Sequence, residues 1–83
     1  MSTLVKDVHA IDLKIGQDSF AVYFADERSL TVPMSYFPRL MKASPEQRTK
    51  FVISGGGTGI HWDEIDEDIS VSGLLLGIGD RTV

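Results

Sequence analysis

The sequence predicts an α+β domain: a small, mostly antiparallel sheet in the order β-β-β-α-β-β-α, with two or three short helices. Runs of alternating apolar and polar residues recur along the chain and end at turn residues, which is typical of short strands. Two proline-containing segments in the middle of the chain begin as helices do. Strands joined by short connections pair as antiparallel hairpins, so we expect an antiparallel sheet.

The first half of the chain contains three strand-like runs, at residues 4–15, 19–25 and 28–33. In the first run, alternation places four residues on one predicted face: His9, Ile11, Leu13 and Ile15. Residues 16–18 form the turn that follows. Asp26 and Glu27 connect the second and third runs, which we expect to form a hairpin.

A short helix is expected over residues 35–43. Ser35 is placed as its N-cap, and Pro38 falls in the first turn, where the backbone N–H has no helical partner to lose. Its apolar face combines three residues at the spacing i, i+3 and i+4: Phe37, Leu40 and Met41.

A second helix start follows at once. Ser44 is the predicted N-cap, Pro45 takes the first helical position, and Gln47 completes a capping box three residues after the cap. The residues from Phe51 onward favour a strand and leave this helix little room. We therefore expect a single helical turn and then a strand over residues 50–54.

The glycines at residues 55–57 are expected to form a hairpin turn between strands at residues 50–54 and 59–62. A phosphate-binding P-loop requires a Lys after the glycines, and none follows here. A dinucleotide-binding loop requires a helix after its glycines, whereas the next residues favour a strand. Glycine supplies the positive φ angles of tight turns, so we predict a structural role.

The last predicted element is a short helix near the C-terminus. Ser70 is its expected N-cap, residues 74–76 form its apolar side, and Gly77 ends it. Residues 1–79 are expected to form a single α+β domain, and residues 80–83 a flexible tail.

The composition excludes several kinds of site. The 83 residues include no Cys, so disulfides, thiolate metal sites and thiol nucleophiles are ruled out. Eight Lys and Arg residues against twelve Asp and Glu residues give a net charge of −4, which disfavours direct binding to DNA or RNA. No apolar run is long enough for a membrane-spanning helix, and the first residues do not form a signal peptide. We expect a cytoplasmic protein that does not bind membranes.

Five carboxylates follow the only tryptophan of the chain: Asp63, Glu64, Asp66, Glu67 and Asp68. One hypothesis is a divalent-metal site formed by Asp66, Asp68 and His61, since hard cations prefer clustered oxygen ligands. The pattern of a calcium loop is broken, because its glycine and its later ligands are missing. Other roles are N-terminal charge for the last helix, an ion pair with Arg39 or Arg48, and protection of an exposed sheet edge.

No catalytic constellation is evident in the sequence, because no Ser or Thr stands in a recognisable motif with a base. We therefore expect a protein that is not an enzyme and needs no cofactor. The residues expected to contact a partner or ligand are Arg39, His61, Trp62, Asp66, Glu67 and Asp68. For Trp62 the alternative role is a core anchor, since one indole is a large share of a small core.

Two long stretches of the chain resemble a known family. VPMSYFPRLMKASPEQRTKF followed by GGGTGIHWDEIDEDISVSGLLLG is similar, almost end to end, to the small bacterial domain of unknown function 2442. The resemblance runs from about Leu4 to Gly79. It is carried by Pro33 with the segment YFPRL, by GIHW at residues 59–62, and by DEDIS with GLL and Gly77.

The resemblance implies an α+β module that occurs alone or in front of a helix-turn-helix domain, and this chain shows no helix-turn-helix of its own. Stand-alone members often lie beside genes for small toxin-like proteins, which implies an antitoxin-like role, and no catalytic residues carry over. The chain departs from the family at Asp63, where Pro is more frequent, and at Asp26 and Glu27, where Asp-Gly is frequent.

The leading hypothesis is therefore a protein-interaction module that neutralises a basic, toxin-like protein partner. Its acidic net charge suits such a partner. Two alternatives belong to other classes. One is a domain that binds a divalent metal or a small ligand. The other is a structural module that forms homo-oligomers by pairing its sheet edges.

Overall fold

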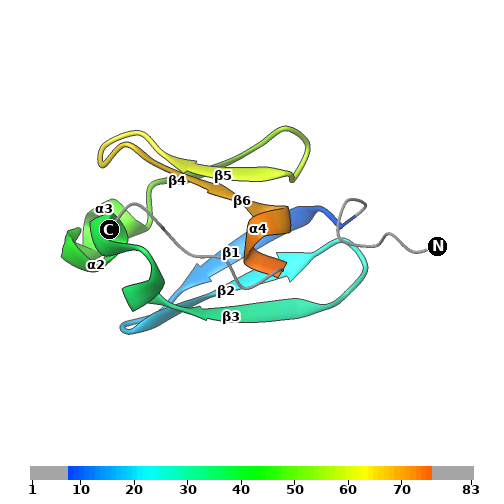
Figure 1. Cartoon of the computed structure of the whole chain (residues 1–83), viewed down its shortest axis with the longest axis horizontal. Coiled ribbons are helices and arrows are strands. Elements are labelled where there is room, and N and C mark those ends of the chain that lie inside the picture. The colour runs from blue at the N-terminus through cyan, green and yellow to red at the C-terminus, as the bar shows by residue number, and fades with distance from the viewer. Residues whose placement is uncertain (1–7, 76–83) are drawn as a thin grey trace.

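Two three-stranded antiparallel sheets form the framework of the protein (Figure 1). The structure is a computed structural model and describes residues 8–75. The first sheet has the order β1-β2-β3, from β1 (Ala10–Ile15), β2 (Ser19–Phe24) and β3 (Ser29–Pro33). The second sheet has the order β4-β5-β6, from β4 (Phe51–Ser54), β5 (Gly59–Trp62) and β6 (Glu67–Ser70).

Short helical segments complete the fold: η1 (Met34–Tyr36), α2 (Pro38–Lys42), α3 (Pro45–Arg48) and α4 (Val71–Leu75). Figure 1 shows α2 and α3 together at one end of the molecule, in the connection between the two sheets. The predicted α+β class and the antiparallel pairing are confirmed. β6 is an addition, because the sequence predicts its residues only as an acidic lead into the last helix.

The core lies between the inner faces of the two sheets. Its largest fully buried side chains come from both sheets and from their connections: Trp62, Phe20, Met34, Leu40, Ile60, Val22 and Val71. The Phe20 ring of β2 meets the Trp62 ring of β5 edge-on at a centroid distance of 6.4 Å. Phe37 packs against Phe20 at 6.1 Å. Such aromatic pairs bury large apolar areas, so this cluster holds the sheets together.

A β-bulge at Ile11 changes which residues of β1 face the core. The register between β1 and β2 shifts between Ala10 and Asp12, so Ile11 is the extra residue. Ala10 and Leu13 are buried, whereas Ile11 is 63% exposed. The predicted shared face of His9, Ile11, Leu13 and Ile15 is therefore wrong, because an extra residue reverses the alternation of the strand.

The segment after β3 forms two helical pieces instead of one. Phe37 is extended, with φ −130° and ψ 95°, and separates η1 from α2. The residue before a proline is pushed away from the helical region, so Pro38 interrupts the predicted helix at Phe37. Ser35 lies inside η1 and is not an N-cap, and Pro38 begins α2. Phe37 and Leu40 are buried as predicted, but Met41 is 48% exposed.

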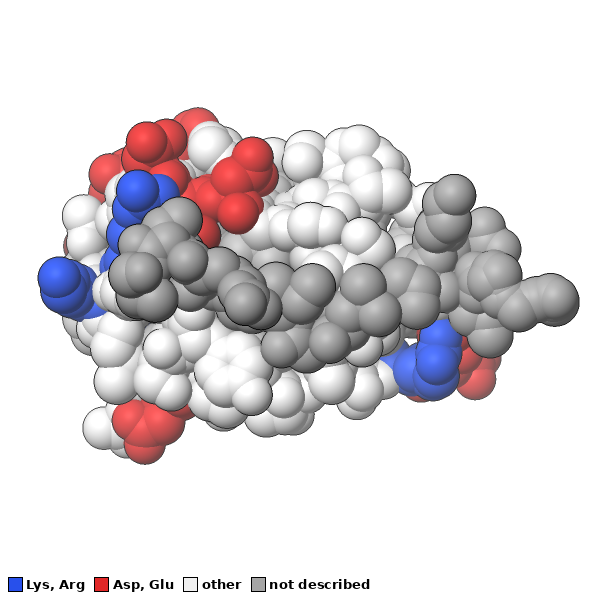
Figure 2. All heavy atoms as spheres, viewed as in Figure 1, with Lys and Arg blue, Asp and Glu red and all other residues white. Residues whose placement is uncertain are grey.

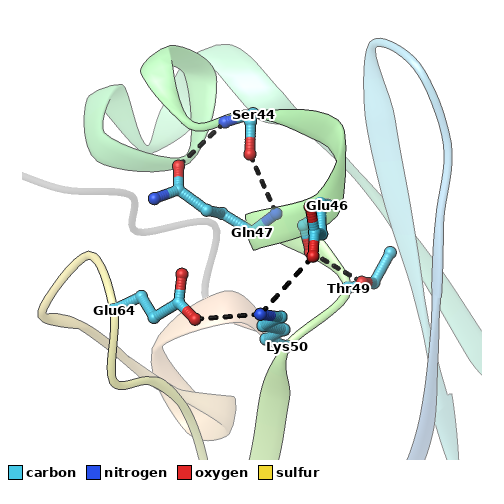
Figure 3. Close-up of polar contacts among 6 residues, drawn as sticks. All are labelled: Ser44, Glu46, Gln47, Thr49, Lys50 and Glu64. Carbon is cyan, nitrogen blue, oxygen red and sulfur yellow. Dashed lines mark hydrogen bonds and ion pairs between the residues drawn. The ribbon is translucent and has the colours of Figure 1, made fainter.

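The start of α3 follows the prediction closely. Ser44 Oγ accepts a hydrogen bond from the Gln47 backbone N–H at 3.1 Å, and Gln47 Oε1 accepts one from the Ser44 N–H at 3.0 Å. Figure 3 shows this reciprocal pair. Pro45 occupies the first helical position. The capping box read from the sequence is therefore confirmed, because it depends only on residues close together in the chain.

The glycine run is a hairpin turn that contacts the first sheet. Gly55, Gly56 and Gly57 have φ angles of 61°, 68° and 108°, which confirms the predicted structural role. The carbonyl oxygen of Gly57 accepts a hydrogen bond from the Ala10 N–H at 2.8 Å. A Cβ atom on Gly57 would lie 2.6 Å from the Ala10 carbonyl oxygen. Glycine at this position therefore allows the turn to approach β1.

Two further predictions concern the hairpin of the first sheet and the last helix. The β2–β3 hairpin is confirmed, and Glu27 in its turn adopts a positive φ of 75°. Ser70 caps α4, since its Oγ accepts a hydrogen bond from the Gly73 N–H at 3.2 Å. The predicted helix end at Gly77 and the predicted tail at residues 80–83 lie outside the described residues.

Candidate functional site

Exposed carboxylates gather around the turn between β5 and β6. We call the surface formed by Asp63, Glu64, Asp66 and Asp68 the acidic face. Figure 2 shows a concentration of acidic atoms at one end of the molecule, where the second sheet lies in Figure 1. The side chains of Asp63 and Asp68 are 82% and 78% exposed. These two carboxylates are therefore largely open to solvent.

The turn itself is compact. Asp66 adopts a positive φ of 54°, a conformation that Asp and Asn tolerate better than other side chains. Its N–H donates a hydrogen bond to the Asp63 carbonyl oxygen at 3.3 Å. Arg39 of α2 donates from Nη1 to the Asp66 carbonyl oxygen at 2.8 Å. Arg39 thus connects the turn to α2 and places one positive charge beside the acidic face.

His61 lies between two carboxylates of the acidic face. Its Nε2 is 2.7 Å from Asp63 Oδ1, and its Nδ1 is 3.7 Å from Asp68 Oδ1. The ladder explains the second contact, since His61 on β5 pairs directly with Asp68 on β6. On its other side His61 pairs with Val52 of β4. The imidazole is therefore anchored on the outer face of the second sheet.

The proposed metal ligands are not assembled as a set. His61 contacts Asp68 and Asp63, whereas Asp66 engages the chain through its backbone. Within residues 8–75, no group of three or more His, Asp or Glu side chains is arranged to hold a metal ion. A cation held by carboxylates requires several converging oxygens.

The two arginines considered as ion-pair partners bond to backbone carbonyl oxygens. Arg39 donates to a carbonyl oxygen, and Arg48 donates to the carbonyl oxygens of Leu40, Met41 and Gln17. Arginine carries several donors in a planar fork, which suits the unpaired carbonyls at a helix end. Lys50 does pair with the acidic turn, since its Nζ lies 3.1 Å from Glu64 Oε2 (Figure 3).

Two of the six residues predicted to contact a partner are buried. Trp62 is fully buried and belongs to the core, which is its alternative role from the sequence. Glu67 is only 4% exposed and lies opposite Trp62 in the β5–β6 ladder. A strand alternates its side chains between faces, so Asp68 points outward where Glu67 points inward. Neither Trp62 nor Glu67 can contribute to an interaction surface.

Five exposed apolar side chains lie outside the set predicted to contact a partner: Ile11, Tyr23, Tyr36, Met41 and Val52. A surface depression of about 540 Å³ beside the β1 bulge is lined by Ile11, Asp12, Leu13, Lys14 and Tyr23. In the sequence these apolar residues resemble core positions. For Ile11, the bulge in β1 accounts for the exposure. Among the described residues, no helix is long and apolar enough to span a membrane.

Comparisons with known proteins agree with this fold. A crystal structure of a protein of unknown function from Rhodospirillum rubrum is 26% identical to the chain, with a TM-score of 0.82 over 92% of this chain and 94% of that one. The solution structure of the uncharacterized protein CV0863 from Chromobacterium violaceum has a TM-score of 0.76 at 24% identity, over 89% of this chain and 70% of that one. A search of the curated proteins finds no match.

The family comparison covers most of the chain. The sequence model described as "Protein of unknown function (DUF2442)" matches residues 10–80. The matched region includes both sheets, the glycine turn and the acidic face, so it agrees with the resemblance read from the sequence. The chain belongs to the DUF2442 family.

Proposed function

We propose that this protein is a non-catalytic, antitoxin-like module that binds a basic protein partner through its acidic face. The observation that supports this most directly is the position of Asp63, Asp66 and Asp68, all exposed around one turn. Of the carboxylates on this face, Glu64 is the one paired with a lysine. The net charge of −4 adds a long-range attraction for a positively charged protein.

The rigid backbone beneath the acidic face supports recognition. The Arg39 bond to the Asp66 carbonyl oxygen and the β5–β6 ladder fix the backbone from which these carboxylates extend. A partner then binds without the cost of ordering a loop. Complementary charges accelerate the association of two proteins, and their attraction decreases as salt screens it. Binding should therefore decrease strongly with ionic strength.

A matched pair of double variants tests the proposal. Asp63→Asn with Asp66→Asn removes two charges from the acidic face, and Asp18→Asn with Glu27→Gln removes two exposed charges from the turns of the first sheet. Co-expression with the product of the adjacent gene, followed by affinity capture, identifies the partner. We expect about tenfold weaker binding for the first variant and little change for the second. Equal effects of the two variants, or no stable complex, would contradict the proposal.

A further inference from the structure

β4 is an edge strand without the usual protection. The two sheets leave four edge strands, namely β1, β3, β4 and β6. The four residues of β4 include no charge and no proline, and their pairing with β5 is regular. Strands that present an open, apolar edge pair readily with another strand. β4 is therefore the edge at which a second chain would add most easily.

The other three edges carry features that oppose pairing. In β1 the bulge interrupts the edge, the Leu13 N–H donates to Asp12 Oδ1 at 2.8 Å, and the Ala10 N–H donates to the glycine turn. β3 ends at Pro33, which has no N–H to donate. β6 carries the exposed Asp68, so two copies of β6 would bring like charges together. These features are the common means of blocking an edge.

The backbone groups of Phe51 and Ile53 point away from β5. The Thr58 carbonyl oxygen, one residue before β5, accepts a hydrogen bond from the Val71 N–H, one residue after β6. Hydrogen-bonded pairs alternate along an antiparallel ladder, so the even-numbered residues of β5 bond to β6 and the odd-numbered residues bond to β4. In the ladder, odd-numbered residues of β5 pair with even-numbered residues of β4. Phe51 and Ile53 are thus left with outward N–H and C=O groups. Among residues 8–75, no hydrogen bond outside the strand ladders involves either of them.

The side chains of β4 are apolar and incompletely covered. Val52 is 54% exposed on the outer face, and Phe51 and Ile53 are half-buried on the inner side. Lys50, which directly precedes the strand, is held by Glu64 at 3.1 Å and by Glu46 at 3.6 Å (Figure 3). The nearest charge is therefore balanced within its own chain and does not oppose a second copy.

We propose that two copies of this chain pair through β4, antiparallel about a two-fold axis at Val52. Phe51 of one copy then lies opposite Ile53 of the other, and the outward N–H and C=O groups of these two residues exchange hydrogen bonds. The same pair repeats on the other side of the axis. Side chains that are half-buried in one copy gain cover, and the two three-stranded sheets become one continuous six-stranded sheet.

A second copy is the occupant that this edge fits best. In an isologous contact the same surface must complement itself. β4 does so because all three residues around the axis are apolar, and no charge of the strand meets a like charge. A contact this short buries less than the roughly 800 Å² per partner of a standard interface, so we expect a dissociation constant on the order of 10 μM. The pairing uses β4 and does not depend on the proposed binding through the acidic face.

The first test compares two matched substitutions in the full chain. Val52→Lys places two like charges at the axis, and Ile11→Lys makes the same change at a residue that is 63% exposed on the first sheet. Light scattering from about 1 μM to about 1 mM should show a mass rising toward twice 9.1 kDa for the wild type and for Ile11→Lys. The Val52→Lys variant should stay at 9.1 kDa, with circular dichroism confirming its fold.

The second test uses the absence of cysteine in the chain. At the axis, Val52 and its counterpart form a pair without mutual hydrogen bonds, whose Cα atoms lie about 4.5 Å apart, within the disulfide range of about 4.4 to 6.8 Å. The Val52→Cys variant should therefore form a disulfide-linked dimer under mild oxidation at least tenfold faster than Ile11→Cys. Equal rates for the two variants would overturn the proposal, even if Val52→Lys fails to fold.

Amide exchange separates a second copy from other occupants. The Phe51 and Ile53 amides should exchange more slowly as protein concentration rises, and they should exchange freely in the dilute monomer. Slow exchange in the dilute monomer would mean that residues 1–7 or 76–83 of the same chain cover β4, which contradicts the proposal. A mass of 9.1 kDa at every concentration would contradict it as well.

Discussion

The indole N–H of Trp62 donates a hydrogen bond of 2.9 Å to the carbonyl oxygen of Arg48, the last residue of α3. This bond joins the centre of the core to the helical connection between the two sheets. The same Arg48 side chain donates to the carbonyl oxygens at the end of α2. The Arg48 carbonyl oxygen therefore accepts the indole hydrogen bond, and the Arg48 guanidinium donates to the carbonyl oxygens of α2. The two sheets are held by this connection as well as by packing.

Trp62→Phe should destabilise the protein by about 2 to 3 kcal/mol. The smaller ring leaves a cavity, and the Arg48 carbonyl oxygen loses its donor, and both effects lower the free energy of unfolding. Urea unfolding monitored by far-ultraviolet circular dichroism measures the change. Tyr23→Phe is the control, because Tyr23 is 38% exposed on the first sheet, and its free energy of unfolding should change little. Equal losses in the two variants would contradict the role of Trp62.

Gly57→Ala should destabilise the protein more than Gly56→Ala. Both glycines have positive φ, but a Cβ on Gly57 would lie 2.6 Å from the Ala10 carbonyl oxygen, whereas a Cβ on Gly56 would meet nothing within 4 Å. We expect a cost of about 1 kcal/mol at Gly56 and at least about twice that at Gly57. Thermal unfolding of the two variants measures the difference, and similar melting temperatures would contradict the close approach of the turn to β1.

Glu27→Gly should stabilise the protein by about 0.5 to 1 kcal/mol. Glu27 adopts a φ of 75°, a conformation that costs an ordinary residue about 1 to 2 kcal/mol and costs glycine little. The greater freedom of glycine in the unfolded chain offsets part of the gain. Glu27→Ala is the matched control, since it removes the same side chain and keeps the strain. A melting temperature that rises equally in both variants would assign the effect to the carboxylate instead.

Asp26 should contribute to stability in a pH-dependent way. The Arg28 backbone N–H donates to its carboxylate and, with the Arg28 guanidinium, lowers the pKa of Asp26 below its usual 3.8. Because the pKa is lower in the folded chain, this contribution is complete above pH 3.8 and is lost as the pH falls through the lower value. Asp26→Asn should therefore lower the melting temperature near neutral pH and change it least at low pH. A difference that grows as the pH falls would contradict this sign.

Added divalent metal should leave the melting temperature unchanged. Within the described part of the chain, His61, Asp66 and Asp68 do not form a coordinating group. A metal that bound only the folded protein would raise its stability in proportion to the logarithm of its concentration. The measurement is thermal unfolding with calcium, magnesium, manganese or zinc added at about millimolar concentration. A rise in melting temperature that His61→Asn abolishes would restore the metal hypothesis.

The sequence by itself determined the features that depend on neighbouring residues. The capping box of Ser44 and Gln47, the positive φ of Gly55 and the cap at Ser70 all follow from local backbone chemistry. The alternation of Phe20, Val22 and Phe24 likewise placed β2 against the core, because a regular strand buries every second residue. These signals were sufficient for the antiparallel α+β class.

Only the tertiary structure decided which residues face solvent where the backbone departs from regularity. The bulge exposes Ile11, although alternation along the chain placed it on the same face as Leu13. Pairing across β5 and β6 buries Glu67 beside the exposed Asp68. The open edge of β4 follows from the order of strands, which contacts between distant residues establish. A local pattern cannot specify such contacts, because their energies depend on what the fold places opposite each side chain.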